Sequence, residues 1–293
     1  MENLTAKTSC FARAYHYRNN QAHIFADTAA ERLLGTDYDE SAQSMAQGIG
    51  FFLPDFHGSA EEGLRLIVDR QLSPSVLGRS AYCEKMLDNE KRLGCRQYIL
   101  FAAGYDTFAI RNQDTSLSVF ELDLPNVLAD KKRRTEQAGL IPGAVSVPCD
   151  LTEEGWKDRL IESGFQCGGK AFASLLGISY YLPRDAFQKL LNTLNGIMCA
   201  GSAICFDYPS RQDGQETRTN RTLAQAAGEQ MKAQYSEQEM EALLEACGFL
   251  IYERLGHQEM TSQYFSDYNT RCPAHRIEAP KGVCYALAVK SRN

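Results

Sequence analysis

Several features that would assign a sequence to a protein class at once are missing from these 293 residues. The ten cysteines include no C-x-x-C pair, and because zinc sites usually contain such closely spaced ligands, we expect no bound metal. No apolar run is long enough to cross a bilayer, so we expect no membrane partner. The N-terminus also lacks the pattern of a signal peptide, which favours a reducing, cytoplasmic location for the thiols.

An excess of positive charge is missing too. The chain has 31 lysines and arginines against 37 aspartates and glutamates, which gives a net charge of −6. This balance does not favour binding to a nucleic acid. One basic cluster, residues 131–134 (KKRR), is typical of the solvated face of a helix. We therefore expect a small-molecule partner and no nucleic acid, whereas the oligomeric state is not indicated.

Two regions of different character divide the chain, without internal repeats or low-complexity segments. Residues 1–95 read as helical and rich in polar side chains. From Arg96 onward, short apolar runs alternate with amphipathic segments, which is the pattern of βαβ units around a parallel sheet. The apolar runs occupy residues 97–103, 117–123, 144–150, 170–177, 202–208, 249–256 and 282–290. Helical periodicity occupies residues 126–138, 153–163, 184–198 and 236–247.

The last part of the chain differs from this alternation. Residues 257–281 are rich in polar and turn residues and show little helical period, so we expect no helix before the final strand. The sixth and seventh strands should then form an antiparallel pair. The sequence predicts an α/β fold: a Rossmann-like sheet of seven strands, mostly parallel with an antiparallel final strand. Residues 1–95 should form a helical cap on a domain of residues 96–293, with an insertion at 209–235 that helps to cover the site.

The first strand ends in a segment suited to close contact with a ligand. In open α/β sheets, ligands bind outside the carboxyl ends of the strands, where the strand order reverses. Ala103 and Gly104 follow the first strand, and a glycine allows the backbone to approach a ligand closely. Asp106 is a residue type that caps the N-terminus of a following helix. We therefore expect this segment to line a binding site.

Acidic residues follow the next two strands. Glu121 lies near the end of the second run and can accept hydrogen bonds from both hydroxyls of a ribose. Asp123 is expected instead to stabilise the N-terminus of the next helix. Asp150 ends the third run and can accept a hydrogen bond from the amine of an adenine, while Leu151 packs on the ring. The sequence therefore predicts a nucleoside site.

A phosphate-binding loop is absent from this site. A dehydrogenase would carry G-x-G-x-x-G to hold a pyrophosphate at a helix N-terminus. Here the residue two positions after Gly104 is Asp106, which would repel a phosphate. A cofactor with ribose and adenine but no phosphate fits better, and S-adenosyl-L-methionine is such a cofactor. A nicotinamide-dependent oxidoreductase on a similar sheet remains the alternative.

Several segments between residues 8 and 208 together resemble the leucine carboxyl methyltransferase-like family, which includes polyketide O-methyltransferases of the tetracenomycin type. The first three are residues 8–14 (TSCFARA) for T-x-x-x-x-R-A, 79–82 (RSAY) for R-[TS]-x-[YF] and 101–111 (FAAGYDTFAIR) for L-G-A-G-L-D-T-R-x-x-R. The others are residues 121–125 (ELDLP) with Lys131 for E-x-D-x-P and a following lysine, 150–151 for D-L, and 176–182 (LGISYYL) for E-G-x-x-x-Y-L.

The resemblance implies S-adenosylmethionine as cofactor and assigns roles to two arginines. Arg79 would pair with the carboxylate of the cofactor's methionine part, and Arg13 is the second choice, in the region that caps the site. Three positions depart from the family pattern: Ala102 replaces a glycine, Phe108 an arginine, and Leu176 the glutamate that lies by the methionine end. These departures keep open a binding protein that has the fold but has lost turnover.

The predicted activity is S-adenosylmethionine-dependent O-methylation of a small-molecule carboxylate or hydroxyl. A carboxylate acceptor needs no general base, because it is already ionised at pH 7. A phenol or an alcohol needs one, and His16 and Asp207 are the candidates. Tyr180 is a further candidate, at the acceptor side of the pocket.

Overall fold

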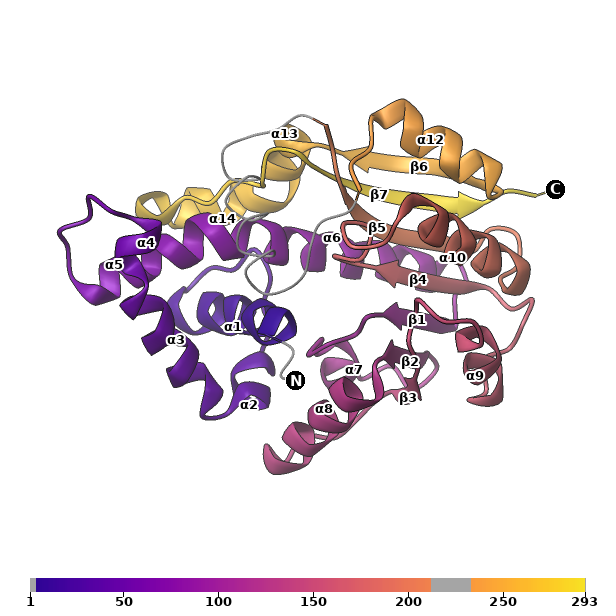
Figure 1. The fold of residues 1–293 in the computed structure, drawn as a ribbon, viewed down its shortest axis with the longest axis horizontal. Helices are drawn as coiled ribbons and strands as arrows, with labels where there is room; N and C mark the ends of the chain where they lie inside the picture. The colour runs from indigo at the N-terminus through magenta and orange to yellow at the C-terminus, as the bar shows by residue number, and fades with distance from the viewer. Residues whose placement is uncertain (1–3, 212–232, 293) are drawn as a thin grey trace.

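The computed structural model describes residues 4–211 and 233–292, which fold around a seven-stranded sheet (Figure 1). The strands are β1 Gln97–Phe101, β2 Ser118–Asp123, β3 Val145–Pro148, β4 Ala171–Leu175, β5 Ala203–Pro209, β6 Phe249–Leu255 and β7 Val283–Lys290. All seven predicted strands are confirmed to within two residues at each end. Short, bounded apolar runs were sufficient to find them, because a strand covered on both faces is apolar along its whole length.

The sheet has the order β3-β2-β1-β4-β5-β7-β6. The first five strands pair in parallel, whereas β7 pairs antiparallel with both β5 and β6. The predicted fold class, a mostly parallel sheet with an antiparallel final strand, is therefore confirmed. The order reverses at β1, which lies between β2 and β4, and ligands bind at such a reversal in open α/β sheets.

Helices cover both faces of the sheet. On one face lie α9 Trp156–Glu162, α10 Arg184–Ile197 and α12 Glu237–Ala246, whose buried apolar side chains pack with those of the strands. On the other face lie α6 Ser73–Arg92 and the short α7 Phe108–Arg111. Helix α8 Pro125–Gln137 connects β2 to β3. The predicted helices are thus present, and α12 begins at a capping box in which the Ser236 side chain accepts from the Glu239 amide.

The expectation that residues 257–281 contain no helix is wrong. The chain there forms α13 His257–Met260, a π-helical turn η2 Thr261–Phe265, α14 Ser266–Arg271 and a 3₁₀ turn η3 Pro273–His275. The π turn inserts an additional residue, so Met260, Phe265 and Tyr268 are all buried although they are five and three positions apart. This spacing hides the helical period from a search for a 3.6-residue repeat.

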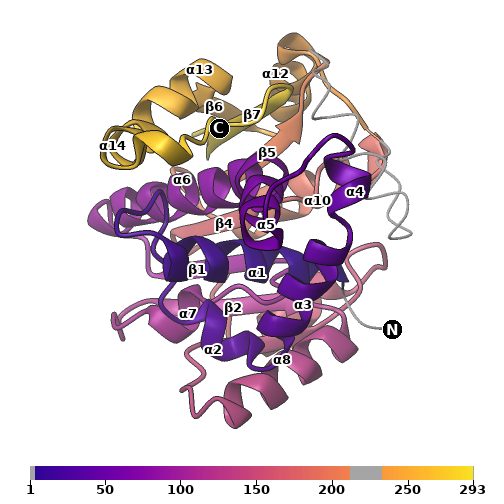
Figure 2. The ribbon, with the colours of Figure 1, turned by 90° about the vertical axis from the view of Figure 1, so that its left-hand side faces the viewer.

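The N-terminal region consists of α1 Leu4–Asn19, α2 Ala30–Leu34, α3 Asp37–Gln47, α4 Ile49–Phe52, α5 Ala60–Ile67, a π-helical turn η1 Val68–Leu72 and α6. Side chains from α1, α2, α3, α5 and η1 form a hydrophobic cluster of their own. These helices gather at the end of the sheet to which the parallel strands point (Figures 1 and 2). The last helix differs, because α6 packs against β4, β5 and β7. The predicted insertion at 209–235 falls mainly on residues 212–232, which lie outside the described residues.

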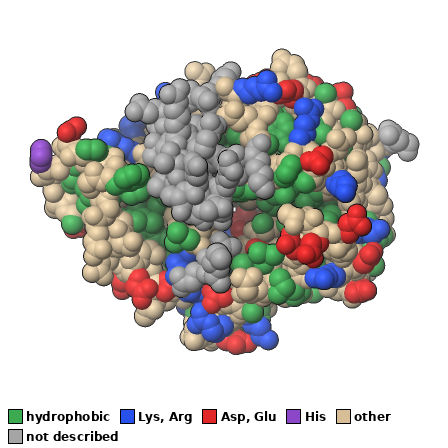
Figure 3. Space-filling model, viewed as in Figure 1, with side chains coloured by type: hydrophobic (Ala, Val, Ile, Leu, Met, Phe, Trp, Pro, Cys, Tyr) green, Lys and Arg blue, Asp and Glu red, His purple; other side chains and the backbone are tan. Residues whose placement is uncertain are grey.

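Basic and acidic side chains are interspersed on the face shown in Figure 3, which is hollowed between the N-terminal helices and the sheet. Within the described parts of the chain, no helix is both long and apolar enough to span a bilayer. All ten cysteines are free of disulfide bonds, and seven of them are buried. Burial in apolar surroundings fits the behaviour of free cysteine as a small hydrophobic residue.

Candidate functional site

A cavity of about 710 Å³ lies at the carboxyl ends of β1, β2, β3 and β4. Its floor is formed by the loops that follow these strands, including Gly104, Asp123 and Asp150. Its wall is formed by α1, through residues such as Ser9, and by α6, through Arg79. The cavity therefore lies where the strand order reverses, between the sheet and the N-terminal helices.

The loop after β1 has an unusual backbone. Ala102 and Gly104 have φ values of 47° and 48°, in the left-handed region that glycine adopts readily. For Ala102 this conformation costs roughly 1–2 kcal/mol, which explains why a glycine is found here in the family that the sequence resembles. A Cβ at Gly104 would lie 3.0 Å from the Cβ of Ala6 on α1. Glycine at 104 therefore allows α1 to lie close over the loop.

The end of β2 is arranged differently from the expectation. Glu121 is buried and does not line the cavity; its carboxylate pairs with Lys131 Nζ at 2.8 Å. Burial raises the pKa of Glu121, and Lys131 acts against this effect. Asp123, the last residue of the strand, lines the cavity instead, and its carboxylate accepts hydrogen bonds from the Gly104 and Leu124 amides, both at 2.7 Å. Asp123 is thus the acidic residue of this strand that lines the cavity.

The two residues predicted to bind a ligand after β3 lie where they were expected. Asp150 and Leu151 both line the cavity. One oxygen of Asp150, Oδ1, accepts hydrogen bonds from the amide and the hydroxyl of Thr152 at 2.8 and 2.7 Å. The side chain is thereby held in place while its second oxygen can accept from a ligand.

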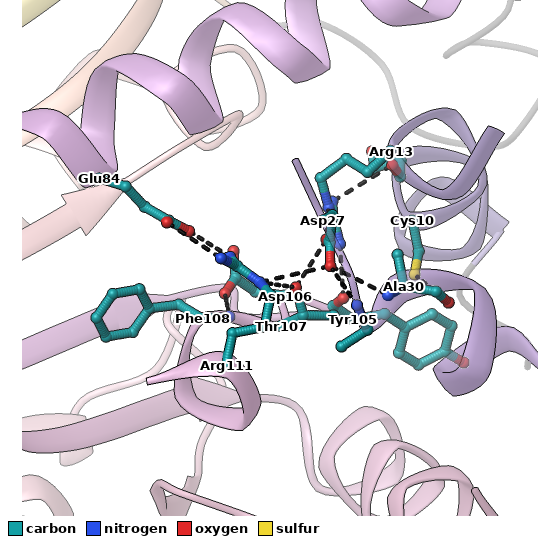
Figure 4. A network of polar contacts seen from close by, with 12 residues as sticks. Cys10, Arg13, Asp27, Ala30, Glu84, Tyr105, Asp106, Thr107, Phe108 and Arg111 are labelled. Atoms are coloured by element: carbon teal, nitrogen blue, oxygen red, sulfur yellow. Dashed lines mark hydrogen bonds and ion pairs between the residues drawn. The ribbon is translucent and has the colours of Figure 1, made fainter. Parts of the chain in front are cut away.

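Arg13 also lines the cavity, but its guanidinium already binds protein groups. Its Nε donates to Asp27 Oδ2 at 2.8 Å and its Nη2 to the Tyr105 carbonyl at 2.7 Å (Figure 4). Burial acts to raise the pKa of Asp27, yet Arg13 and Arg111 hold it below its usual value. Arg13 therefore fastens α1 to the loop after β1, and this contact leaves it less able to bind a cofactor.

Asp27 is the centre of the network in Figure 4. Besides Arg13, its carboxylate accepts from the Thr107 hydroxyl at 2.7 Å and lies 3.5 Å from Arg111 Nε. Arg111 in turn binds both oxygens of Glu84 on α6. No sequence pattern pointed to Asp27 or Glu84, whereas Arg111 could have been found as the final arginine of the FAAGYDTFAIR segment. The network therefore joins the N-terminal helices and the cavity loop to α6, which packs against the sheet.

Two more residues of that loop line the cavity, and Phe108, the first residue of α7, belongs to the core beside it. Asp106 lines the cavity, and its Oδ1 accepts from the Phe108 amide at 2.7 Å. Ala103 lines the cavity as well. Phe108 itself is buried against Tyr98, with ring centroids 5.1 Å apart. The departure at position 108 is therefore accommodated in the apolar core.

The predicted catalytic candidates lie outside the cavity lining. His16 is buried, and its Nε2 accepts from the Ile24 amide at 3.0 Å. Burial lowers the pKa of His16 to about 3, with smaller contributions from His23 and Arg65. His16 is therefore not placed to act as a base. Its Nε2 already accepts a hydrogen bond inside the N-terminal region, and the residue does not line the cavity.

Asp207 and Tyr180 lie behind the wall that contains Leu176 and Arg79. Asp207 is fully buried at the end of β5, and the Tyr180 hydroxyl donates to its Oδ2 at 3.0 Å. Arg79 and Leu176 line the cavity, whereas Asp207 and Tyr180 do not. The structure thus brings Arg79 to the cavity as expected, and places Asp207 against it from the rear, with Arg79 Nη1 3.8 Å from Asp207 Oδ2.

Comparisons with known proteins show the family of the chain. The profile of the leucine carboxyl methyltransferase family matches residues 6–195. The chain belongs to this family. A relative from Bacillus subtilis, YktD, is 38% identical over 95% of this chain and 97% of its own, and its name places it among S-adenosyl-L-methionine-dependent methyltransferases. A relative from Mycobacterium avium with the same assignment is 34% identical, over 47% of this chain and 45% of its own.

Solved structures show the same fold. A DUF574 family protein from Streptomyces avermitilis superposes with a TM-score of 0.58 over 96% of this chain and 97% of its own, at 13% identity. Family membership makes the chain an S-adenosylmethionine-dependent methyltransferase, with S-adenosylmethionine as its cofactor. This decides against the nicotinamide-dependent alternative.

Proposed function

We propose that the chain transfers a methyl group from S-adenosylmethionine to an oxygen of a small molecule, with the cavity at the ends of β1 to β4 as the site. The observation that carries this proposal is the set of acids at successive strand ends, Asp123 and Asp150, beside a loop that has no phosphate-binding pattern. Such a cavity fits a nucleoside without phosphate groups.

The residues present fit this cofactor. Asp123 would accept from the ribose hydroxyls, because each of its oxygens accepts one backbone amide and retains a further lone pair. Asp150 would accept from the adenine amine, with Leu151 against the ring. Arg79 would pair with the carboxylate of the methionine part. Glu121, the predicted ribose ligand, is instead paired with Lys131 in the interior.

The cofactor supplies an activated methyl group, and the protein supplies alignment and shelter from water. Gly104 and the α1 residues above it bring the wall close to the loop. Among the described residues that line the cavity there is no histidine and no lysine, and its three aspartates, Asp106, Asp123 and Asp150, each accept hydrogen bonds from backbone amides. A carboxylate acceptor is already ionised at pH 7 and needs no proton removed. This lining therefore favours a carboxylate over a phenol or an alcohol as the acceptor.

A binding protein without turnover is the second candidate, and two observations favour it. Leu176 lines the cavity where the family has a glutamate, and Ala102 pays a backbone cost where the family has a glycine. Both changes would weaken the hold on the cofactor. Neither removes a group that touches the transferred methyl, so we favour an active enzyme.

The test uses S-adenosylmethionine carrying a labelled methyl group. The protein is incubated with this cofactor and a panel of small carboxylic acids, phenols and alcohols, and labelled products are then treated with mild alkali. A methyl ester releases labelled methanol under these conditions, whereas a methyl ether does not. We expect alkali-labile label. Alkali-stable label would point to a hydroxyl acceptor, and calorimetric binding of cofactor without any transfer would support the binding protein.

A further inference from the structure

Asp207 is a buried carboxylate that touches the cavity wall from behind. It lies at the end of β5 with no exposed surface and does not line the cavity. Its Oδ1 accepts from the Gly177 amide at 2.6 Å, and its Oδ2 accepts from the Tyr180 hydroxyl at 3.0 Å. A buried charge is tolerated only when it is paired and hydrogen-bonded, so these contacts fix the carboxylate firmly. It has no open path to a methyl acceptor.

Arg79 stands between this carboxylate and the cavity. Its Nη1 lies 3.8 Å from Asp207 Oδ2, and its side chain is 19% exposed toward the cavity that it lines. Gly177, with φ of 69°, lies directly against the guanidinium: a Cβ there would be 2.7 Å from Nη1. On the side of α1, Arg79 Nη2 donates a long hydrogen bond of 3.4 Å to Ser9 Oγ. Arg79 therefore has a charged partner and the Gly177 turn behind it, and a neutral hydroxyl on the α1 side.

We propose that Asp207 is a positioning residue that aims Arg79 at the carboxylate of the cofactor, so that the cavity selects nucleosides that carry this carboxylate over those that lack it. The inference rests on the proposed function, because it takes the methionine part to lie at Arg79. Two effects of Asp207 oppose each other. Its negative charge weakens the attraction of Arg79 for a ligand carboxylate, but its contact restricts a long side chain to one direction.

Orientation outweighs charge here for a structural reason. The side chain of Arg79 is flexible, and its guanidinium binds a carboxylate strongly only when the plane of the group faces that carboxylate. Without Asp207, Arg79 loses a charged partner and keeps the 3.4 Å hydrogen bond to the neutral Ser9 hydroxyl. This bond is weak, because contacts between a charged and a neutral group at this distance hold a side chain less firmly than an ion pair. The Gly177 turn would also lose the acceptor that fixes it beside the guanidinium. A misdirected Arg79 loses its contact with the ligand even though its own charge is unchanged.

The variant that separates these effects is Asp207→Asn. Its amide oxygen can still accept from Gly177, while the amide NH₂ replaces the oxygen that faces Arg79 and Tyr180. Calorimetry compares S-adenosylmethionine with decarboxylated S-adenosylmethionine, which lacks only the carboxylate. We expect Asp207→Asn to weaken binding of S-adenosylmethionine about tenfold, as for loss of a charged contact. Binding of the decarboxylated form should change by no more than about twofold.

Two further variants complete the test. Ser179→Ala removes a hydrogen bond to the main-chain oxygen of Asp207, at 2.7 Å, and keeps the carboxylate. This control should leave the preference for the carboxylated form unchanged. Arg79→Ala should abolish the preference, and Asp207→Asn should then add nothing in that background.

Each outcome decides something different. Equal weakening of both ligands by Asp207→Asn, or an unchanged or tighter hold on S-adenosylmethionine, would overturn the positioning role. The same loss of preference in Ser179→Ala would overturn it as well, because general loosening would then explain the result. If the wild-type protein binds neither sulfonium, the proposed function itself fails, and the inference fails with it.

Discussion

The two sides of the cavity are built in different ways. The nucleoside side consists of strand ends, where Asp123 and Asp150 are held by amides of their own or neighbouring loops. The opposite side depends on contacts between segments far apart in the chain, such as Arg13 with the Tyr105 carbonyl and Arg79 with Asp207. The first side follows from the topology of the sheet, whereas the second depends on how the N-terminal helices dock. Changes on the two sides should therefore have different consequences.

The largest effect should come from Asp27→Asn on the docked side. This carboxylate is 1% exposed and pairs with both Arg13 and Arg111, so loss of its charge leaves the buried Arg13 without its ion-pair partner, whereas Arg111 keeps Glu84. Breaking such a buried pair costs about 3–5 kcal/mol of unfolding free energy. Urea denaturation measures the loss, and hydrogen exchange should show it concentrated in α1.

A matched control is Asp88→Asn. Asp88 is 63% exposed and lies 3.7 Å from Lys91, so this surface pair should contribute less than about 1 kcal/mol. Equal destabilisation by both variants would mean that the Asp27 network does not hold the N-terminal helices in place.

The next largest effect separates two acids on one strand. Asp123→Asn should weaken S-adenosylmethionine binding by about 2–4 kcal/mol, because two charge-assisted hydrogen bonds to ribose are lost, and should cost about 1–3 kcal/mol of stability, because its NH₂ cannot accept from one of the Gly104 and Leu124 amides. Glu121→Gln should destabilise the protein, since Lys131 is then buried without its ion-pair partner. Calorimetry and thermal melting on both variants check this. A loss of affinity in Glu121→Gln with unchanged melting would restore Glu121 as the ribose ligand.

This pair of acids also shows what the sequence can and cannot predict. The strands could be predicted from their apolar runs. The place of Asp150 and Leu151 in the cavity lining could be predicted too, because they follow the carboxyl end of a strand, where a parallel sheet binds ligands. The cavity is lined by Asp123 and not by Glu121, which alternation could not predict, because residues two positions apart on a strand lie on the same face. Asp27 could not be found, since its partner Thr107 is 80 positions away.

The docked side should also respond to acid through His16. Its pKa in the folded protein is lowered to about 3 from an ordinary 6.5, so the unfolded chain binds a proton first as the pH falls. The stability is complete above pH 6.5 and decreases toward pH 3, by about 1.4 kcal/mol per pH unit within this window. Between pH 6 and pH 4, His16→Gln should therefore lose about 2–3 kcal/mol less unfolding free energy than the wild type. Parallel pH profiles would contradict this.

The smallest effect concerns Leu176, on the side opposite the nucleoside. Leu176→Glu would place a carboxylate on the cavity wall, where the ammonium of the methionine part can meet it, and should tighten cofactor binding by roughly 1.5–3 kcal/mol. Without cofactor the new charge is unpaired, so the melting temperature should fall. Leu176→Gln, which keeps the shape without the charge, is the control. Unchanged binding in Leu176→Glu would place the methionine part away from this residue.

The most direct test of the account is electron density for S-adenosylhomocysteine bound to the crystalline protein. We expect the nucleoside at the carboxyl ends of β1, β2 and β3, with both ribose hydroxyls within hydrogen-bond distance of Asp123 and the adenine beside Asp150 and Leu151. The carboxylate should face Arg79. Density for the nucleoside outside this cavity, or a ribose that contacts no acid at the end of β2, would contradict the account.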